Sequence, residues 1–480
     1  MRYEIEAKQG GFYDVVVCGG GTAGVCAAIA AAREGMKTLL LERTFTVGGM
    51  LTLGEAGITK FTEHCRDAET YKNEVLDVLS ENPRKVQVVG GLAHEYCKRM
   101  IDAGGALGTH GETGSYVFTD RYAAEVTLVD MLREAGVTVL YDTRVCTVRM
   151  DGDTLQAVVV VNKEGFTEYE AKCFIDATGD ADVAALSGVE YHVGVSETDL
   201  AEGCGRTVGE LQGMGTMYRV RGVDYEKMFA YLDENSDRFF MQEFGVMSLE
   251  SVKESYRRGD SMVFRLLIDH PTDLSAPRQK VQVYNLPEKD EAILLGWGCG
   301  TGSVSGLNPL ELSQAQDKLL HGALRLTEVM RQYPGFENIT VQYIPDVGVR
   351  ETRHIVGEYT ITGMDVVLGR DFEDSVACGG HPVDIHPLPP EVEHMDMNHW
   401  RFHIPYRVMV PAKVENLLVA GRPVSATRLA SGAIRPTAQC MALGEAAGVA
   451  AAICASENRS PRQVDTAVLR RKRLEKGAIL

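Results

Sequence analysis

Apolar runs separated by glycine-rich or charged breaks predict the elements of this chain. The β-branched, apolar run Asp14–Cys18 is typical of a strand that is buried on both faces of a parallel sheet. A small-residue helix over Thr22–Glu34 follows, and then a second apolar strand that ends at Glu42. The first forty residues therefore predict a strand, a helix and a second strand of one parallel sheet.

The next clear pattern begins at Tyr122–Ala135, where apolar residues recur with the 3.6-residue period of an amphipathic helix. Val137–Tyr141 reads as a short strand, and a turn at 151–153 leads into a returning strand over Leu155–Asn162. This order predicts the second half of the same sheet, with a small antiparallel meander.

Residues 190–290 break this pattern. The segments YEKMFAYLDENSDRFF and ESYRRGDSMVFRLLI are rich in Met, Tyr and Arg, and we interpret both as helices. Beyond them the pattern predicts a strand over Ala292–Trp297, a long helix over Asn308–Gln332, a buried strand over Asn416–Ala420 and a last helix over Thr437–Ala455.

Composition narrows the classes of partner. Over 480 residues the net charge is −18, which disfavours nucleic acid and anionic membranes, since both attract basic surfaces. The eleven cysteines include no C-x-x-C pair, so we expect no disulfide framework, zinc ribbon or iron–sulfur cluster. The start, MRYEIEAKQGG, lacks the apolar core of a signal peptide, and the longest helical apolar stretch, Ala446–Ala455, is short for a bilayer. We expect a cytoplasmic chain.

Gly19, Gly21 and Gly24 fit the pattern G-x-G-x-x-G between the first strand and the first helix. The first glycine permits the tight turn, the second lets the backbone approach a pyrophosphate, and the third lets the helix pack on the strand. The helix directs its N–H groups at the phosphates, and Glu42 follows at the spacing of an acid that holds a ribose hydroxyl. This context predicts an adenine dinucleotide.

Further segments favour a flavin dinucleotide. Arg43 and the pair Gly48-Gly49 extend the nucleotide unit, the strand FIDATGDAD ends in a tight turn, and the last strand leads into a small-residue helix. The start of that helix would face the pyrimidine edge of a flavin. The expected cofactor contacts are Gly19, Gly21, Thr22, Ala23, Gly24, Glu42, Arg43, Gly48, Gly49, Met50, Val145, Ala177, Thr178, Gly179, Gly421, Arg422, Gly432 and Ala433.

On these motifs the chain resembles the FAD-dependent oxidoreductase family of the glutathione-reductase-type fold, whose cofactor domain is related to fumarate reductase flavoproteins. The residues that carry the resemblance are GGGTAG, LLLERTFTVGGM, FIDATGDAD, DVGVRETRHIVGEYTIT, PVDIH, IPYRVMVP and NLLVAGRPVSATRLASGAIRPTAQCMALGEAAG. The resemblance implies FAD and redox chemistry, and it implies no substrate.

We therefore expect an α/β fold, in which a Rossmann-like FAD-binding domain has a parallel sheet, a small antiparallel meander and an inserted α+β substrate or cap domain. The expected parts are 1–190 and 411–480 for the FAD-binding domain, 191–290 for the substrate or cap domain, and 291–410 for a mixed substrate-side and interface segment.

The chain has no second G-x-G-x-x-G, because the glycines of Gly296–Gly302 lack the third required spacing. We thus expect one resident dinucleotide and an external electron donor or acceptor: a substrate, a nicotinamide, a quinone, oxygen or an electron-transfer protein. His64 or Cys65 could tether a flavin, but no specific mark supports this, and we expect noncovalent FAD.

The segment HPVDIHP offers the first candidates for proton transfer. Asp384 and His386 alternate, so a strand would place them on one side, where the carboxylate could orient the ring for acid–base work. We assign catalysis to this pair, with His386 as the residue that transfers the proton. With His381 the same residues could instead hold a metal, or form ordinary loop hydrogen bonds.

The segment VRETRHI holds Arg350, Thr352 and His354 on one face of a possible strand. This face could meet flavin or substrate, or the arginine could be a buried ion pair with Glu351 or Asp346.

A third set consists of arginines near the last strand. Arg407 and Arg428 are assigned catalytic roles beside the flavin, and Arg435 flanks the same loop, because arginine can bind a substrate carboxylate or carbonyl. His399 and His403 could line a pocket or cover the core.

These features predict an enzyme that transfers a hydride between a small organic substrate and flavin N5. Two directions stay open: reduction of an activated C=C bond with an external donor, and oxidation of an alcohol or sugar. A flavin-binding protein without turnover is a further alternative, and the charge opposes an RNA-modifying enzyme. Homo-oligomers are compatible with the sequence.

Overall fold

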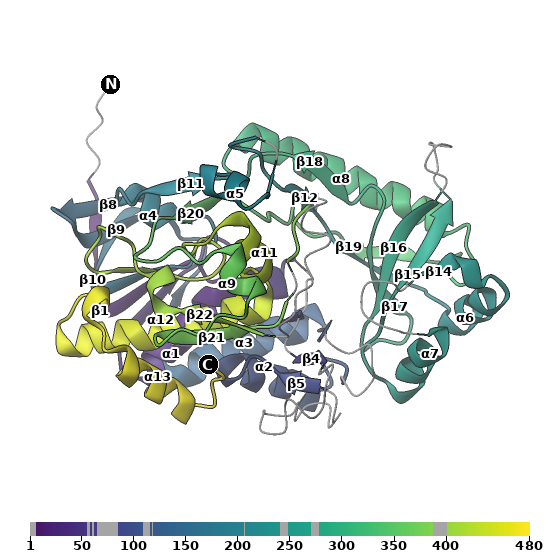
Figure 1. The fold of residues 1–480 in the computed structure, drawn as a ribbon, viewed down its shortest axis with the longest axis horizontal. Helices are drawn as coiled ribbons and strands as arrows, with labels where there is room; N and C mark the ends of the chain where they lie inside the picture. The colour runs from purple at the N-terminus through teal and green to yellow at the C-terminus, as the bar shows by residue number, and fades with distance from the viewer. Residues whose placement is uncertain are drawn as a thin grey trace.

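Two large sheets organise this computed structural model, one near each end of the molecule (Figure 1). The structure describes residues 6–54, 58–59, 62–64, 85–108, 116–117, 119–205, 207–240, 248–269, 278–381, 383–386 and 401–480.

The first sheet has the order β7-β2-β1-β10-β9-β8, and β23 also pairs with β10. β1, β2, β7, β10 and β23 pair in parallel, whereas β8 and β9 form an antiparallel meander on β10. This confirms the predicted α/β, Rossmann-like architecture. Its strands are β1 (Lys8–Cys18), β2 (Thr38–Leu41), β7 (Thr138–Leu140), β8 (Arg144–Asp151), β9 (Thr154–Asn162), β10 (Gly165–Asp176) and β23 (Leu417–Val419).

Burial on both faces of this sheet follows from the apolar run in β1. Val15 and Val17 belong to the core between the sheet and its helices, while Val16 and Cys18 belong to the core on the opposite face. A parallel strand with helices on one side and the meander on the other has no solvated face, so its sequence is apolar throughout.

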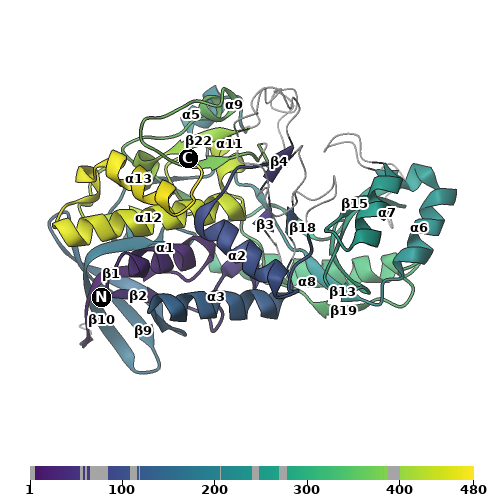
Figure 2. The same ribbon diagram turned by 90° about the horizontal axis from the view of Figure 1, so that it is seen from below.

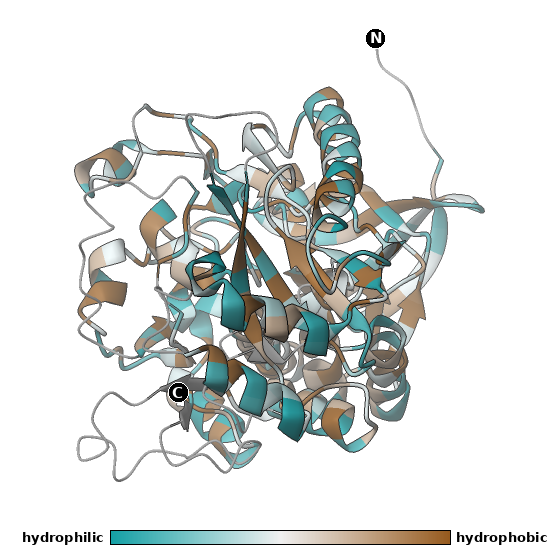
Figure 3. Ribbon diagram, turned by 90° about the vertical axis from the view of Figure 1, so that its right-hand side faces the viewer, coloured by the Kyte–Doolittle hydropathy of each residue, from teal (hydrophilic) through white to brown (hydrophobic). Residues whose placement is uncertain are grey.

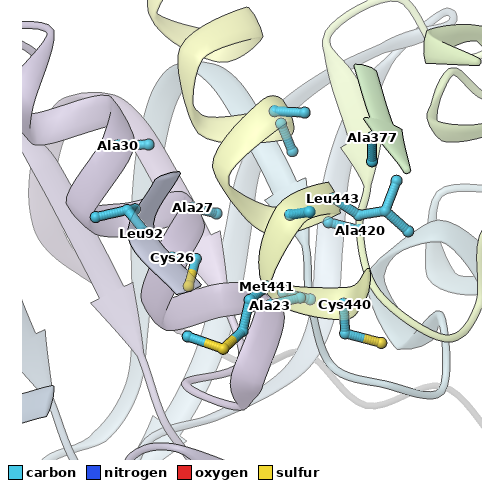
Figure 4. Packing of buried hydrophobic residues seen from close by; sticks show 14 of the residues in the cluster. Ala23, Cys26, Ala27, Ala30, Leu92, Ala377, Ala420, Cys440, Met441 and Leu443 are labelled. Carbon is cyan, nitrogen blue, oxygen red and sulfur yellow. The ribbon is translucent and has the colours of Figure 1, made fainter. Parts of the chain in front are cut away.

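Helices on one face of the first sheet pack closely on one another (Figure 2). They are α1 (Thr22–Arg33), α2 (Gly91–Asp102), α3 (Arg121–Ala135), α12 (Thr437–Glu457) and α13 (Thr466–Glu475). Glycines bring α12 against α1: a Cβ on Gly444 would lie 2.0 Å from the carbonyl oxygen of Ala23, and a Cβ on Gly448 would lie 2.2 Å from that of Ala27. Figure 4 shows the small side chains that line this contact.

Helix α12 is longer than the apolar stretch expected at Ala446–Ala455. It has 21 residues, and the mean hydropathy of its most apolar 18-residue window is 1.4, so by length and composition it could cross a membrane. All of that window is nevertheless buried inside the protein. A helix that is apolar on every side is stable inside a protein core, and α12 contacts the first sheet as well as α1, α2 and α13.

The second sheet is antiparallel, with the order β14-β15-β16-β17-β13-β19. α6, α7 and α8 accompany it, and hydropathy colouring shows hydrophilic and hydrophobic faces on the helices at this end (Figure 3). The elements are β13 (Tyr218–Arg221), α6 (Tyr225–Glu234), β14 (Phe239–Phe240), α7 (Leu249–Arg258), β15 (Val263–Asp269), β16 (Arg278–Asn285), β17 (Glu291–Leu295), α8 (Pro309–Met330) and β19 (Thr340–Tyr343).

This sheet corrects two expectations. The boundary expected at residue 290 falls between β16 and β17, which pair with each other, so the second unit continues to β19. The segment expected to be one helix, ESYRRGDSMVFRLLI, ends its helix at Arg258 because Gly259 adopts a positive φ of 79°. The residues that follow alternate between buried and partly exposed positions, which is the period of a strand.

Short elements connect these parts. They are 3₁₀ helices at Gly49–Leu51, Ser236–Arg238, Tyr406–Met409 and Pro461–Gln463; β3 (Ile58–Thr59), β4 (Thr62–His64), β5 (Lys85–Gln87), β6 (Tyr116–Val117), β11 (Tyr191–Val193), β12 (Gly213–Gly215), β18 (Gly300–Ser303), β20 (Arg353–Ile355), β21 (Ser375–Gly379) and β22 (Phe402–Pro405); and α4 (Asp182–Leu186), α5 (Glu197–Ala201), α9 (Gly363–Val367) and α11 (Arg428–Ile434).

The α1–α12 contact yields a first prediction. Gly444→Ala should lower the free energy of unfolding by about 1–3 kcal/mol, because the added methyl group meets a main-chain carbonyl that cannot move alone. Urea denaturation measures the change. Gly302→Ala is the control, since a Cβ there meets no atom within 4 Å; equal effects of the two substitutions would contradict the helix contact.

Candidate active site

A cleft of about 1240 Å³ lies between the two sheets and is lined by residues from both. The first sheet contributes the loops at the carboxyl ends of β1, β2, β10 and β23, which is where open parallel sheets bind ligands. The second sheet contributes one face of β15, β16 and β17. We treat this cleft as the candidate active site.

The glycine turn after β1 leaves a cradle at the edge of the cleft. A Cβ on Gly24 would lie 1.8 Å from the carbonyl oxygen of Gly19, so this glycine is required for the helix to pack on the turn. A Cβ on Gly21 would meet no atom within 4 Å, although Gly21 lines the cleft. The space beside Gly21 therefore suits a pyrophosphate that approaches the main chain.

Glu42 is fixed at the end of β2 by hydrogen bonds to its buried carboxylate. The N–H of Gly20 donates to Oε2 at 2.7 Å, and the N–H and hydroxyl of Thr44 donate to Oε1 at 2.7 and 2.8 Å. A carboxylate held in this way beside the cleft can also accept a hydrogen bond from a ribose hydroxyl.

Arg422 joins the other two cofactor segments. Its guanidinium lies 2.7 Å from Asp180 Oδ1 and donates to the hydroxyl of Thr352 at 2.9 Å. Burial alone would raise the pKa of Asp180, but Arg422 outweighs it, and the pKa lies below its ordinary value. This pair locks the turn after β10 against the loop after β23.

Two helices begin at this cleft without a side-chain cap. The N-caps are Gly21 for α1 and Pro436 for α12, and both line the cleft. The helices run parallel, and their contacts imply that α12 begins roughly six residues, or ~9 Å, before α1 does. Two positive helix ends spaced along one cleft fit an elongated dinucleotide, with the pyrophosphate at α1 and the polar ring edge at α12.

Most of the expected cofactor residues lie on the cleft. They are Gly19, Gly21, Thr22, Ala23, Glu42, Arg43, Gly49, Met50, Val145, Ala177, Thr178, Gly179, Gly421 and Arg422.

Four expected cofactor residues do not line the cleft. Gly24 serves the helix packing described above, and Gly48 donates its N–H to the carbonyl of Gly20. Gly432 and Ala433 correct the expectation. Gly432 packs against the main chain of Asp384, and Ala433 is buried in the core. The helix start that faces the cleft is that of α12, not the preceding α11.

The structure brings the predicted proton-transfer pair into the cleft. His386 Nε2 lies 2.8 Å from Asp384 Oδ1, and Arg435 Nη2 lies 2.8 Å from Asp384 Oδ2. Burial would raise the pKa of Asp384, but the hydrogen bond from His386 and the charge of Arg435 hold it well below its ordinary value. The ionised carboxylate fixes a proton on Nε2 and leaves Nδ1 of His386 for exchange.

The two arginines assigned to catalysis, Arg407 and Arg428, do not line this cleft. Arg407 lies in the 3₁₀ helix Tyr406–Met409, pairs with Asp374 at 2.9 Å and lies over the ring of Tyr359. Arg428 is almost fully buried, lies 3.7 Å from Glu351 and does not line the cleft. Each acts in packing.

The cleft instead contains Arg350, which the sequence left open between a substrate contact and a buried ion pair. The arginine that does lie beside Glu351 is Arg428. The alternating face expected for VRETRHI holds only in part: Arg350 reaches the cleft, whereas His354 is buried against His192, with ring centroids 5.5 Å apart.

Sequence reasoning missed the wall that the second sheet provides. Lys280, Gln282 and Tyr284 alternate along β16, and Arg265 lies opposite Gln282 on β15. The alternation in RQKVQVYN was the available signal, but it was hidden by the helical interpretation of this region.

The other histidine and cysteine candidates from the sequence do not share one location. His381 lines the cleft, whereas His403 contacts Asp371 and the Cys378 sulfur. Within the described ranges no three His, Cys, Asp or Glu side chains gather as metal ligands. The side chain of His64, and Cys65 and His399, lie outside the described residues.

Comparisons with known proteins support FAD as the cofactor. The family model for FAD dependent oxidoreductases matches residues 14–473. The NADH:fumarate oxidoreductase of Klebsiella pneumoniae is 30% identical in an alignment of 213 positions that covers 39% of this chain and 23% of that protein. Digeranylgeranylglycerophospholipid reductase 1 of Methanococcoides burtonii is 28% identical over 181 residues, which are 37% of this chain and 40% of that protein. The matches thus span less than half of either relative.

Solved structures give distant matches. A geranylgeranyl bacteriochlorophyll reductase-like protein of Thermoplasma acidophilum is 14% identical, with a TM-score of 0.43 over 97% of this chain and 84% of that one. A triple mutant of the flavin-dependent brominase Bmp2 is 11% identical, with a TM-score of 0.44 over 96% and 84%.

The Gly21 cradle can be tested directly. Gly21→Ala should leave the apoprotein as stable as the wild type, because the methyl group meets no protein atom, yet weaken FAD binding at least about tenfold by filling the pyrophosphate space. Titration of apoprotein with FAD measures the affinity, with Gly302→Ala as the control. Unchanged FAD affinity would show that no ligand occupies this space.

His354 gives a prediction about pH. Burial, with His192 and Arg422 nearby, lowers its pKa from 6.5 to about 3. Below pH 6.5 the unfolded chain binds a proton here that the folded protein does not, so the free energy of unfolding falls by about 1.4 kcal/mol per pH unit down to pH 3. In urea denaturation between about pH 4 and pH 7, the free energy of unfolding of His354→Leu should depend less steeply on pH than that of the wild type. Parallel curves would refute the contribution.

Proposed function

The chain belongs to the FAD dependent oxidoreductase family, and on that premise we propose that it transfers a hydride between FAD and a small organic substrate bound between the two sheets. The observation that carries this proposal is the His386–Asp384 pair, which shares one cleft with the glycine cradle. A hydride step on carbon needs a matching proton step, and this pair can provide it.

FAD, when bound, supplies a hydride donor or acceptor at N5 of its ring. Gly21, Glu42 and the starts of α1 and α12 would hold it, as their positions along the cleft support. The protein's own chemistry then lies in positioning, in proton transfer and in the exclusion of water.

His386 would hold the proton that moves. Asp384 accepts from Nε2–H and is itself fixed by Arg435, so the ring has one orientation and Nδ1 is the exchanging atom. On the opposite wall, Met217, Tyr284 and Leu295 supply apolar surface that displaces water from a bound substrate.

Either direction of transfer is compatible with this arrangement. A protonated His386 can give a proton to carbon during reduction of a C=C bond, and a neutral His386 can take one from a hydroxyl during oxidation of an alcohol or sugar. The external electron partner and a cytoplasmic location are also parts of the proposal. The net charge of −18 supports a location away from anionic surfaces.

A kinetic experiment tests the assignment. His386→Gln should retain FAD but slow flavin reduction or reoxidation by about 10²- to 10⁴-fold, because it removes the exchanging proton. Anaerobic stopped-flow absorbance with NADH, NADPH, alcohols, sugars and enoates also identifies the direction. Arg407→Gln, outside the cleft, is the control. Full rates in His386→Gln would remove the residue from the mechanism.

A further inference from the structure

Arg350 is a cation on the cleft that forms no ion pair with a carboxylate among the residues that the structure describes. Its Nη1 donates to the carbonyl of Gly213 at 2.6 Å, and none of the ion pairs among the described residues includes Arg350. Its guanidinium lies flat against Gly215, where a Cβ would be 3.0 Å from Nη2. Two glycines of β12 thus contact this guanidinium: Gly213 accepts a hydrogen bond from it, and Gly215 leaves room for it.

Arg350 lies among other basic residues of the cleft. Arg435 lies close enough to repel it, although Arg435 is itself bound to Asp384. Arg265 and Lys280 line the facing wall, and Asp346 is the other acid on this part of the cleft. Burial and the charge of Arg435 lower the pKa of Arg350 to about 10, so it stays charged at neutral pH at an energetic cost.

A charge that is largely removed from water is costly to a fold unless something pairs with it. Arg428 shows the structural solution in the same protein, since it lies beside Glu351 away from the cleft. Arg350 has no ion pair of this kind among the described residues and reaches the cleft instead, which is the arrangement of a ligand-binding arginine.

We propose that Arg350 binds a carboxylate group of the substrate, so that the substrate is a small carboxylic acid. This assignment rests on the proposed function for its substrate role. A guanidinium presents a planar fork of N–H donors that matches the two oxygens of a carboxylate. Nη1 donates to the carbonyl of Gly213, and the side chain lines the cleft, where its other N–H groups could donate to a carboxylate.

The assignment also places the reacting part of the substrate. Asp384 acts on Arg350 electrostatically and contacts His386 at 2.8 Å, so Arg350, Asp384 and His386 form one neighbourhood. A carboxylate on Arg350 would therefore bring the adjacent carbons of a small acid to the proton-transfer pair. Arg350 is in this sense a specificity-determining residue.

Binding to the FAD-loaded protein tests the assignment without turnover. The probes are lactate, succinate and glutarate, with lactamide, succinamide and glycerol 2-phosphate as comparisons. Calorimetry and the perturbation of visible flavin absorbance report binding. The carboxylates should bind the wild type, and the amides should bind at least tenfold more weakly, because they lack the charge that Arg350 recognises.

Variants identify the residue. Arg350→Met should weaken carboxylate binding by about 10- to 100-fold, and Arg350→Lys should restore part of it, because the charge returns without the fork. Arg407→Met, outside the cleft, should bind as the wild type does. FAD content and thermal midpoint establish that each variant is folded, and the wild-type comparison of acids with amides stands independently of any variant.

The outcomes separate this assignment from the proposed function. Equal binding of acids and amides, tighter binding of the phosphate ester, no carboxylate binding, or wild-type affinity in Arg350→Met would each overturn the role of Arg350. A carboxylate that binds through Arg350 while no substrate exchanges electrons with FAD would instead contradict the proposed function. Turnover of a neutral substrate, with no binding of the carboxylates, would support the proposed function and contradict the role of Arg350.

Discussion

The close contact between α1 and α12 is the constraint on which the cofactor side of this protein depends. Gly444 and Gly448 sit directly on the carbonyls of Ala23 and Ala27, so the two helix axes approach more closely than side chains would allow. Because each helix begins at the cleft, their separation and offset set the positions of two positive helix ends. Helices spaced by larger residues would no longer present both ends to one ligand.

The cleft's charges are arranged by a few fixed pairs. Glu42 is held by Gly20 and Thr44, Asp180 by Arg422, and Asp384 by Arg435 and His386. Each carboxylate is anchored before any ligand arrives, which limits the reorganisation that binding requires. In the part of the chain that the structure describes, Arg428 has a carboxylate beside it and Arg350 has no ion pair, so the partners of an arginine, and not its residue type, indicate its role.

The sequence was sufficient for the first sheet because its signals are local. The apolar run of β1, the glycines of the turn and the acid after β2 lie within thirty residues, and each has one physical explanation. The second sheet was not predictable in the same way. Its strands alternate only weakly, and Arg265 interrupts the apolar residues of β15, so a helical period was equally acceptable until pairing with β16 was known.

The site residues show the same difference between local signals and long-range contacts. His386 and Asp384 could be predicted because they lie two residues apart in one segment. That Arg407 and Arg428 lie away from the cleft could not be predicted, because their partners, Asp374 and Glu351, are distant in sequence. Long-range pairing is a tertiary property, and composition near a motif does not reveal it.

The position of β23 has a consequence for how the molecule is made. This strand pairs with β10, and the α12 that follows covers α1, so residues beyond 416 complete a unit that begins at β1. During synthesis α1 leaves the ribosome about four hundred residues before α12, the helix against which it packs. The second sheet, whose strands are all contiguous between 218 and 343, can form earlier. The two helix starts that face the cleft therefore come together only after the residues of α12 have been made.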